Sequence, residues 1–385
     1  MRTLIVSDLH LGSTSRSDLL RRAELRAPLL EALADVDRVV LLGDVLELRH
    51  GPMRDAMAAA RPFFEDLGRA LAGRELVVLA GNHDHALVDP WLAHRGEEHE
   101  PPPLGVEQLL DPAQASPAMQ RIAGWVSPAP MRVAYPGLWV RPDVYATHGH
   151  YLDCHLTVPT LERLSAGAMA RLLGRSPSSF HCVGDYEAVG APMFAWRDTV
   201  ARDARTGAAL NGAATVTAWD ALRGTAARDG HARRVPAQWL RRHAIAAAFP
   251  LAVAALNRAG IGPLRPDISM SELRRAGLRA MGEVAARLDL GDAYVVFGHT
   301  HRAGPLPGDA PEEWRGRGGA RLVNAGSWTY ASVFLRGAPG ESPYWPGTCV
   351  LVEDDGPPVI KRLLQDRAHA QIASPPRPRS PHRRA

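Results

Sequence analysis

The chain has 385 residues, of which 46% are hydrophobic and 22% are charged. This balance is typical of a globular protein, with one large domain carrying an insertion or with two domains. It excludes a wholly disordered chain, a collagen-like repeat and a disulfide scaffold. Lysine and arginine number 45 against 41 acids, and the net charge of +4 equals the four arginines of residues 374–385, which contain no acid. The rest of the chain is neutral by count, so we expect no nucleic-acid partner.

Cysteine usage and the first strand predict a cytoplasmic location. The three cysteines show no CxxC spacing and are expected to be reduced thiols. Residues 2–7 already have the pattern of a buried strand, which leaves no room before it for the apolar core of a signal peptide. The most apolar stretch, residues 244–256, is too short to span a bilayer and contains Pro250. We therefore expect no transmembrane segment, while a weak peripheral contact with a membrane stays open.

Short runs of branched apolar residues alternate with helical patterns in the first part of the chain. Helical periodicity predicts helices over residues 18–33 and 53–71, the second kinked or split at Pro62. Strand–helix–strand alternation predicts an α/β domain with a largely parallel sheet. The apolar runs have the length of strands buried on both faces and cover Leu4–Ser7, Val39–Leu42, Leu76–Ala80, Val144–Thr147 and Tyr294–Phe297.

The middle and the end of the chain differ from this pattern. Residues 151–290 are rich in Ala and Arg with apolar residues at helical spacing, which predicts a mainly helical insertion or cap. It would divide an α/β core into residues 1–150 and 291–366, followed by a disordered Pro/Arg-rich tail over residues 374–385. Residues 98–118 and 304–319 are expected to be loops. A second, more antiparallel sheet is predicted from the strands Arg321–Asn324, Thr348–Glu353 and Val359–Leu363.

Each of the five apolar runs ends in side chains that can bind a metal ion. Residues just beyond the carboxyl ends of parallel strands meet in one crevice. Each ending alone is typical of a turn or a helix cap, but five together predict a metal centre. Ligands of the Asp, Asn and His types without a thiolate suit Mn, Fe, Ni or Zn, and their number predicts two ions bridged by one carboxylate. The endings are Asp8-Leu9-His10, Gly43-Asp44, Gly81-Asn82-His83-Asp84, His148-Gly149-His150 and Gly298-His299-Thr300-His301.

The ordered blocks DLH, GDVLE, GNHD, THGH and GHTH resemble the signature of the calcineurin-like metallophosphoesterases, over about residues 1–146 and 293–364. The resemblance implies a four-layer αββα sandwich of two mixed sheets with two divalent metal ions at the strand ends, Mn being expected ahead of Fe, Zn or Ni. It also implies that Asn324, in an Asn-Ala-Gly-Ser turn, supports the site. Asp8, His10, Asp44 and His301 would hold one ion, and Asp44, Asn82, His148 and His299 the other.

The resemblance implies a mechanism as well. Two cations about 3.5–4 Å apart clamp a phosphoryl oxygen and lower the pKa of a bridging water, and the resulting hydroxide attacks phosphorus. His83 would contact the phosphate and help the leaving group depart. Asp84 would either orient His83 by accepting its second ring proton or cap the following helix, and both alternatives stay open. His150 and Arg302 are further candidates for contact with substrate or ligands, although Arg302 could equally be a surface charge.

The substrate class is suggested by a narrower resemblance. GDVLE and His148-Gly149 are similar to the motifs of UDP-2,3-diacylglucosamine pyrophosphatases, which also carry a helical cap. This chain has His83 where those enzymes have Arg, His150 where they have Asp, and a longer insertion. We predict hydrolysis of a phosphodiester or pyrophosphate bond in a small nucleotide- or lipid-linked substrate. The alternatives are a phosphomonoesterase or protein phosphatase, a nuclease, and a non-catalytic scaffold of the same fold.

Two features of the insertion allow two interpretations each. Residues 244–256 could offer an apolar face to an acyl chain, but a helix buried in its own subdomain is preferred. Asp153-Cys154-His155 and His181-Cys182 could form a third metal site, yet their spacing matches no usual zinc pattern. Ordinary polar or core roles are therefore preferred for them, although Asp153 and His155 could reach the cleft because they follow the fourth motif.

Overall fold

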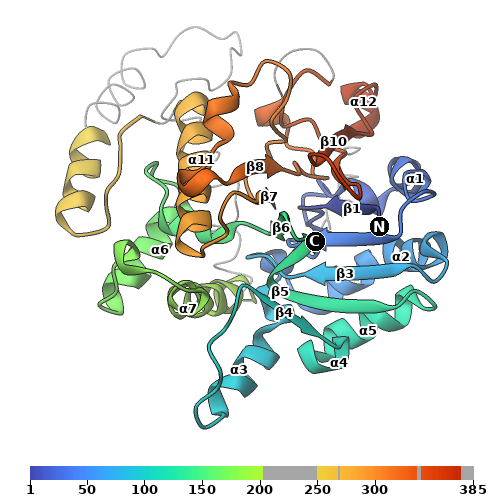
Figure 1. The fold of residues 1–385 in the computed structure, drawn as a ribbon, viewed down its shortest axis with the longest axis horizontal. Helices are drawn as coiled ribbons and strands as arrows, with labels where there is room; N and C mark the ends of the chain where they lie inside the picture. Colours follow the sequence, from blue (N-terminus) through green and yellow to red (C-terminus); the bar gives the residue numbers. More distant parts are fainter. Residues whose placement is uncertain (203–248, 268, 336–339, 374–385) are drawn as a thin grey trace, which may run out of the picture.

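The computed structural model describes residues 1–202, 249–267, 269–335 and 340–373, and the predicted α/β class is confirmed (Figure 1). The strands are β1 (Thr3–Val6), β2 (Arg38–Leu42), β3 (Glu75–Leu79), β4 (Glu107–Leu110), β5 (Met131–Arg141), β6 (Val144–Thr147), β7 (Tyr294–Phe297), β8 (Arg321–Asn324), β9 (Thr348–Val352) and β10 (Val359–Arg362). The helices are α1 (Ala23–Glu31), α2 (Met53–Leu71), α3 (Asp89–Glu97), α4 (Pro112–Ala115), α5 (Pro117–Val126), α6 (Leu161–Leu172), α7 (Val183–Arg202), α11 (Met270–Arg287) and α12 (His369–Ile372).

The strands form one sheet in the order β10-β9-β1-β2-β3-β5-β6-β7-β8, with β4 paired to β5. Neighbouring strands are parallel from β1 through β2 and β3 to β5, and again from β6 through β7 to β8. The pair β5–β6 is antiparallel, as are β4–β5, β1–β9 and β9–β10. Two parallel halves therefore meet at β5 and β6. Where the sequence predicts two sheets, hydrogen bonding through the 11-residue β5 joins both halves into one.

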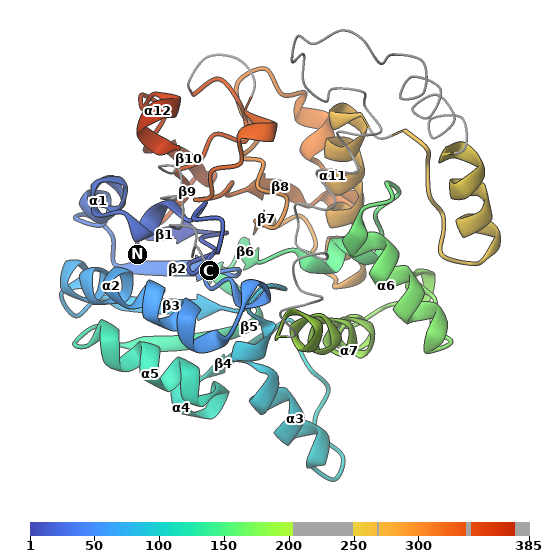
Figure 2. The same ribbon diagram turned by 180° about the vertical axis from the view of Figure 1, so that it is seen from behind.

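Alternation along the strands divides the apolar side chains into three clusters. Leu4 and Val6 of β1 pack in a cluster with residues of α1, α2 and α5, whereas Ile5 between them belongs to a cluster of strand residues from both halves, including Val296. Phe297 packs on the other side of β7, in a cluster with residues of α6, α7 and α11. Both faces of the strands are thus covered, because successive side chains point to opposite faces. The two groups of helices lie on opposite sides of the molecule (Figures 1 and 2).

Two segments between β3 and β6 differ from the sequence prediction. Residues 98–118, expected to be a loop, contain β4, α4 and the start of α5, and the long strand β5 was not predicted at all. The signal for β5 is interrupted by Pro136, a residue type normally kept out of central strands. A bulge accommodates it, because Glu107 of β4 pairs with both Pro136 and Gly137. The expected loop 304–319 contains two short 3₁₀ helices, Pro311–Trp314 and Arg317–Gly319.

The last three strands do not form the predicted second sheet. β8 pairs in parallel with β7 at one end of the strand order, whereas β9 and β10 lie antiparallel at the other end. The 3₁₀ helices between β7 and β8 supply the crossover that a parallel pair requires, and the sequence pattern gave no indication of it. Helix α2 runs through Pro62 as one helix, so the splitting alternative of the prediction is wrong. The buried Phe63 and Phe64 of α2 pack in the core beside this proline.

The described part of the predicted insertion is helical, with α6, α7, residues 249–258 and α11. Residues 244–248 of the apolar stretch, and the tail 374–385, lie outside the described residues. Glu187 of α7 ties the insertion to the core: its Oε1 accepts from the Tyr135 hydroxyl of β5 at 2.6 Å and from the Tyr151 hydroxyl, and its Oε2 contacts His85 Nε2 at 3.3 Å. Within the described ranges, no helix combines the length and apolarity needed to cross a membrane.

Candidate metal centre

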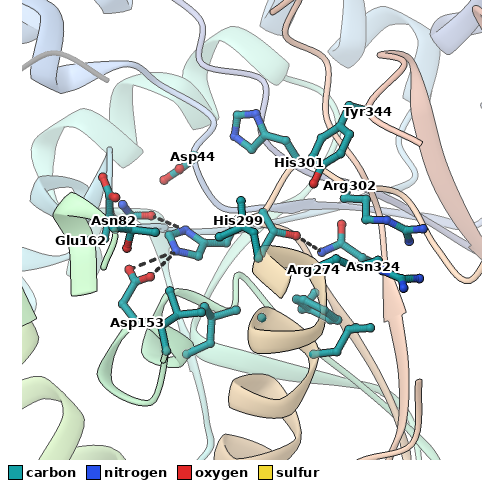
Figure 3. A pocket seen from close by; sticks show the side chains of 18 of the residues that line it. Asp44, Asn82, Asp153, Glu162, Arg274, His299, His301, Arg302, Asn324 and Tyr344 are labelled. Carbon is teal, nitrogen blue, oxygen red and sulfur yellow. Dashed lines mark hydrogen bonds and ion pairs between the residues drawn. The ribbon is translucent and has the colours of Figure 1, made fainter. Parts of the chain in front are cut away.

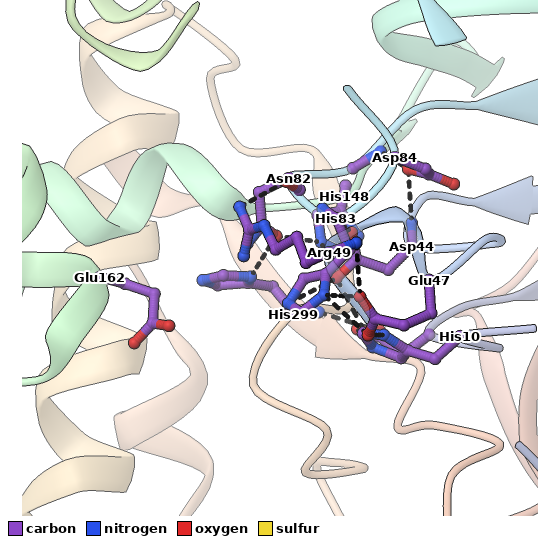
Figure 4. A network of polar contacts seen from close by, with 12 residues as sticks. His10, Asp44, Glu47, Arg49, Asn82, His83, Asp84, His148, Glu162 and His299 are labelled. Atoms are coloured by element: carbon purple, nitrogen blue, oxygen red, sulfur yellow. Dashed lines mark hydrogen bonds and ion pairs between the residues drawn. The ribbon is translucent and has the colours of Figure 1, made fainter. Parts of the chain in front are cut away.

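The polar ends of β1, β2, β3, β6 and β7 meet at one edge of the sheet (Figure 4). The first two loops are joined by their backbones, since His10 N donates to the carbonyl oxygen of Asp44 at 2.8 Å. The third loop is joined to the second by His83 N, which donates to Asp44 Oδ1 at 2.8 Å. The fifth is joined to the first by His299 N, which donates to Asp8 Oδ2 at 3.0 Å. The carboxylates that are predicted to bind metal therefore also hold the loops together.

The backbone is strained at most of the predicted ligands. Asp8, His10, Asp44, His299 and His301 have φ values of 56°, 45°, 49°, 64° and 58°. They are five of the nine non-glycine residues with positive φ in the described part of the chain. Such a conformation costs of order 1–3 kcal/mol per residue and persists only where the surrounding structure imposes it. The strain is concentrated where the chain must turn ligand side chains toward one point.

One group of ligand atoms comes from the ends of β1 and β7. His301 Nε2 lies 3.1 Å from Asp8 Oδ1 and 3.3 Å from His10 Nε2. Asp44 Oδ2 lies 3.6 Å from His10 Nε2. Asp8 Oδ1 is buried and makes no hydrogen bond, while its other oxygen accepts from Ser7 Oγ at 2.6 Å. A buried carboxylate oxygen without a donor, facing two imidazoles, is the arrangement that a divalent cation would satisfy.

A second group forms on the other side of Asp44. His148 Nε2 lies 3.3 Å from Asp44 Oδ2, and Asn82 Oδ1 lies 3.1 Å from both His148 Nε2 and His299 Nδ1. Turning the Asn82 amide over would make its nitrogen donate to both rings and its oxygen accept from Arg49. A cation among these atoms favours the orientation with the oxygen inward. Asp44 Oδ2 then faces both groups, as a bridging carboxylate must.

Each of the four predicted histidine ligands is held by a contact at its other ring nitrogen. Metal-binding histidines usually have such a partner, which fixes the tautomer and the ring orientation. The sequence did not identify these partners. They are Glu47 Oε2 for His10 Nδ1 at 3.0 Å, the Leu42 carbonyl for His148 Nδ1 at 3.0 Å, Asp153 Oδ2 for His299 Nε2 at 3.0 Å and Thr329 Oγ1 for His301 Nδ1 at 3.2 Å.

Two glycines make room for the predicted ligands. A Cβ at Gly298 would lie 2.0 Å from Ser7 Oγ and 2.4 Å from Asp8 Oδ2, and a Cβ at Gly81 would lie 2.3 Å from Asp44 Oδ1. Real side chains do not tolerate such contacts, so only glycine lets these loops approach the carboxylates. Glycine beside a predicted ligand therefore lets the backbone come close to the carboxylates, as the sequence motifs indicate.

The charge state of the carboxylates suits metal binding. Burial alone would raise the pKa of Asp8 and Asp44, but the surrounding imidazoles outweigh it and hold both pKa values below the usual range. For Asp8 the main opposing group is His301, and for Asp44 it is His148. Both carboxylates are therefore ionised at neutral pH, as metal ligands must be.

Asp84 has neither of the two predicted roles. Its carboxylate accepts from the backbone N–H groups of Gly81 (2.7 Å), Asp44 (3.2 Å), Val45 (2.7 Å) and Leu46 (3.0 Å), and it makes no side-chain cap to the following helix. Burial and the nearby Asp44 carboxylate raise its pKa to about 6. Asp84 thus joins the loop after β3 to the loop after β2. Its carboxylate accepts from four backbone N–H groups instead of from the ring of His83.

Glu47 takes the role expected of Asp84 and was missed as a site residue. Its Oε1 and Oε2 lie 3.0 and 2.9 Å from His83 Nδ1, and Oε2 also contacts His10 Nδ1. One buried carboxylate thus orients both a predicted ligand and the predicted phosphate-contacting histidine. The sequence feature that could have identified Glu47 is its position at the end of the GDVLE block. Burial, together with the positive charge of Arg49, lowers the pKa of His83 to about 4.

The remaining predicted residues occupy three different environments. His150 is buried against Phe194 with no hydrogen bond at either ring nitrogen. Arg302 is a buried, paired charge and not a surface one, with Nη2 and Nη1 lying 2.5 and 3.1 Å from the two carboxylate oxygens of Asp309. Asn324 donates to the Gly298 carbonyl at 2.8 Å and so holds the loop after β7.

The third-metal hypothesis finds no support among the described residues. Potential metal-binding groups of three or more Asp, Glu, His or Cys residues there all consist of residues at the strand ends. Asp153 contacts His299, His155 Nε2 contacts the Tyr186 hydroxyl at 2.8 Å, Cys154 is buried and Cys182 is exposed. Asp153 therefore does reach the cleft, where it contacts a predicted ligand.

The clustered Asp and His side chains suit a metal-dependent hydrolase of phosphoric esters. Residues 1–171 match the calcineurin-like phosphoesterase family, a range that contains four of the five strand-end motifs. The family model thus places the first part of the chain, residues 1–171, in the calcineurin-like phosphoesterase superfamily. No curated protein matches it at a significant level.

Proposed function

We propose that the protein is a dinuclear metal-dependent phosphoesterase that hydrolyses a phosphodiester or pyrophosphate bond in a small phosphorylated substrate. One observation carries the proposal: ligand atoms from five loops face two adjoining points, and each histidine among them is held at its other nitrogen. Asp8, His10, Asp44 and His301 would hold one ion, and Asp44, Asn82, His148 and His299 the other. Manganese is the proposed metal, and the cytoplasm is the proposed location.

Bound divalent ions would supply Lewis-acid polarisation of the phosphoryl group and activation of the attacking water. The residues of the chain then position and exchange protons. His83 presents Nε2 toward Asp44 Oδ2, 4.0 Å away, while Glu47 holds its Nδ1. Because its pKa is low in the free protein, His83 is a neutral imidazole whose Nε2 accepts a proton. An incoming phosphate favours the imidazolium, and this form would protonate the leaving oxygen.

Arg49 adds positive charge behind this histidine. Its buried guanidinium donates to the Asn82 carbonyl at 2.5 Å, which fixes the loop carrying Asn82 and His83. Its Nε is buried without a hydrogen-bond partner. A cation held at this place strengthens the attraction of the cleft for a substrate phosphate, because a neighbouring charge acts strongly where water is excluded.

The test compares two chromogenic esters on the same metal-loaded protein. After removal of metal and reconstitution with Mn²⁺, we expect two ions per chain by mass spectrometry, and faster hydrolysis of bis(p-nitrophenyl) phosphate than of p-nitrophenyl phosphate. A strong preference for the monoester would favour a phosphomonoesterase or a protein phosphatase. Two bound ions with no hydrolysis of either ester would favour the non-catalytic scaffold.

A further inference from the structure

A cavity of about 280 Å³ adjoins the metal centre (Figure 3). Asp44, Asn82, His299 and His301 line the end nearest the predicted ions. The greater part of the wall is apolar and is formed by residues of the predicted insertion, of β7 and of the 3₁₀ helix Pro311–Trp314. These apolar residues include Leu152, Leu156, Leu273, Leu278, Phe297 and Trp314.

The arginines of the same wall are paired with neighbouring carboxylates, whereas the buried Trp314 Nε1 has no hydrogen-bond partner. Arg302 forms the two contacts to Asp309, and Arg274 Nη2 pairs with Glu313 Oε2 at 2.7 Å. Thr300 Oγ1 accepts from Asn324 Nδ2 at 3.0 Å. A site that recognises a nucleobase presents unsatisfied donors and acceptors to its edges, because burying those edges unpaired is costly. A wall of leucines and aromatic rings with paired charges suits a hydrocarbon instead.

A glycine opens the cavity on the side of α11. Gly277 lies in the wall, and a Cβ at this position would have Thr300 Cγ2 at 3.7 Å, an ordinary contact. Glycine in the middle of a helix costs about 1 kcal/mol relative to alanine. Here its missing side chain leaves space beside the metal ligands, so a larger residue at 277 would project into the cavity.

We propose that this cavity binds an aliphatic chain, alkyl or acyl, carried by the phosphoester on the side opposite the leaving group. The inference rests on the proposed function, because the chain is positioned by the phosphoryl group that the metal centre would hold. It assigns the substrate to the amphiphilic phosphoesters. The phosphate occupies the polar end, and the hydrocarbon replaces water along Leu156, Leu278 and Phe297.

A homologous series of substrates measures the cavity directly. With the full chain reconstituted with Mn²⁺, kcat/KM is determined for p-nitrophenyl phosphodiesters whose second group runs from methyl to octyl. A buried methylene contributes ~0.8 kcal/mol, so we expect kcat/KM to rise about fourfold per methylene until the cavity is filled. A flat series, or a nucleoside ester turned over faster than the octyl ester, would overturn the proposal.

A second experiment separates this proposal from the catalytic one. Dissociation constants of methyl- to octylphosphonate are measured by calorimetry, which requires no turnover. The affinity should rise with chain length in the wild type and lose most of this dependence in Gly277→Leu. Gly124→Leu, at an exposed position of α5 with nothing within 4 Å, is the matched control and should keep the full dependence. Chain-length-dependent binding without hydrolysis would reject the catalytic proposal alone, and hydrolysis with a flat binding series would reject the cavity alone.

Discussion

The predicted ligands and the cavity wall come from two regions of the chain that differ in how they are built. The predicted ligands are at the ends of core strands, where hydrogen bonding within the sheet and strained turns fix each side chain. Much of the wall comes from Leu152, Leu156 and α11 of the insertion, where apolar packing sets the shape. Chemistry and substrate choice can therefore vary separately in this architecture. Asp153 is the exception, since it belongs to the predicted insertion and contacts His299, a predicted ligand of the core.

The largest effect is expected from removing the shared carboxylate of the core. Asp44→Asn keeps the volume but removes the negative charge that faces both groups of ligands. We expect turnover to fall below detection and neither ion to be retained, because the ligand that both ions share is lost. Metal content by mass spectrometry and kcat with the aryl diester are the measurements. Asp35→Asn, at an exposed position, is the control. Full activity in Asp44→Asn would contradict a dinuclear centre.

His83→Ala should separate metal binding from proton transfer within the core. The variant removes the imidazole held by Glu47 but none of the seven predicted ligands. We expect two ions per chain and a fall in kcat of roughly 10²–10⁴-fold, the range for loss of a general acid or base. His94→Ala, an exposed histidine of α3, controls for loss of an imidazole elsewhere. Loss of metal from His83→Ala would make this residue a structural support instead.

The sequence identified the candidate ligand side chains that the structure brings together, but not the groups that hold them. Buried parallel strands leave continuous apolar runs, and their ends share an edge, so the placement of Asp8 or His148 follows from pattern and topology. Partners such as Asp153 depend on how side chains turn in three dimensions, and Asp84 shows that adjacency in sequence is a poor guide to this. In the fold, β5 was missed because Pro136 interrupts its pattern and a bulge has to absorb it.

The two supporting carboxylates allow the core and the insertion to be compared directly. Glu47→Gln and Asp153→Asn each replace a carboxylate that holds a ligand histidine, and such changes typically cost 10–100-fold in metal affinity or activity. Asp153→Asn should weaken only the ion held by His299. Glu47→Gln should weaken the ion held by His10 and also lower kcat, because it releases His83 as well.

Metal titrations that resolve the two ions test this pair of variants. Two variants with the same pattern of loss would show that the ions bind as one cooperative unit. Unchanged affinity in Asp153→Asn would show that the insertion is not needed for metal binding. Metal binding would then depend on the residues of the core.

The smallest effect on kcat is expected from the tie between α7 and the core. Glu187→Gln removes the charge that accepts from Tyr135 and Tyr151 and that faces His85. Hydrogen bonds to charged groups contribute about 1.5–3 kcal/mol, so we expect a loss of this order in the free energy of unfolding, measured by denaturant titration. Glu97→Gln, at an exposed position of α3, is the control and should change stability by less than about 0.5 kcal/mol.

The pH dependence of unfolding distinguishes this buried tie from ordinary packing. Burial would lower the pKa of His85, but Asp89 and Glu187 outweigh it and raise the pKa to about 10 in the folded protein. The unfolded value is near 6.5, so the stabilisation from protonated His85 is complete below about pH 6.5 and is lost as the pH rises toward 10. The stability gap between wild type and Glu187→Gln should therefore narrow between pH 6.5 and 10. A stability gap that stays constant with pH would assign the effect of Glu187 to its hydrogen bonds with Tyr135 and Tyr151. Both tyrosine hydroxyls stay protonated over this range, because burial and then the negative charge of Glu187 raise their pKa values.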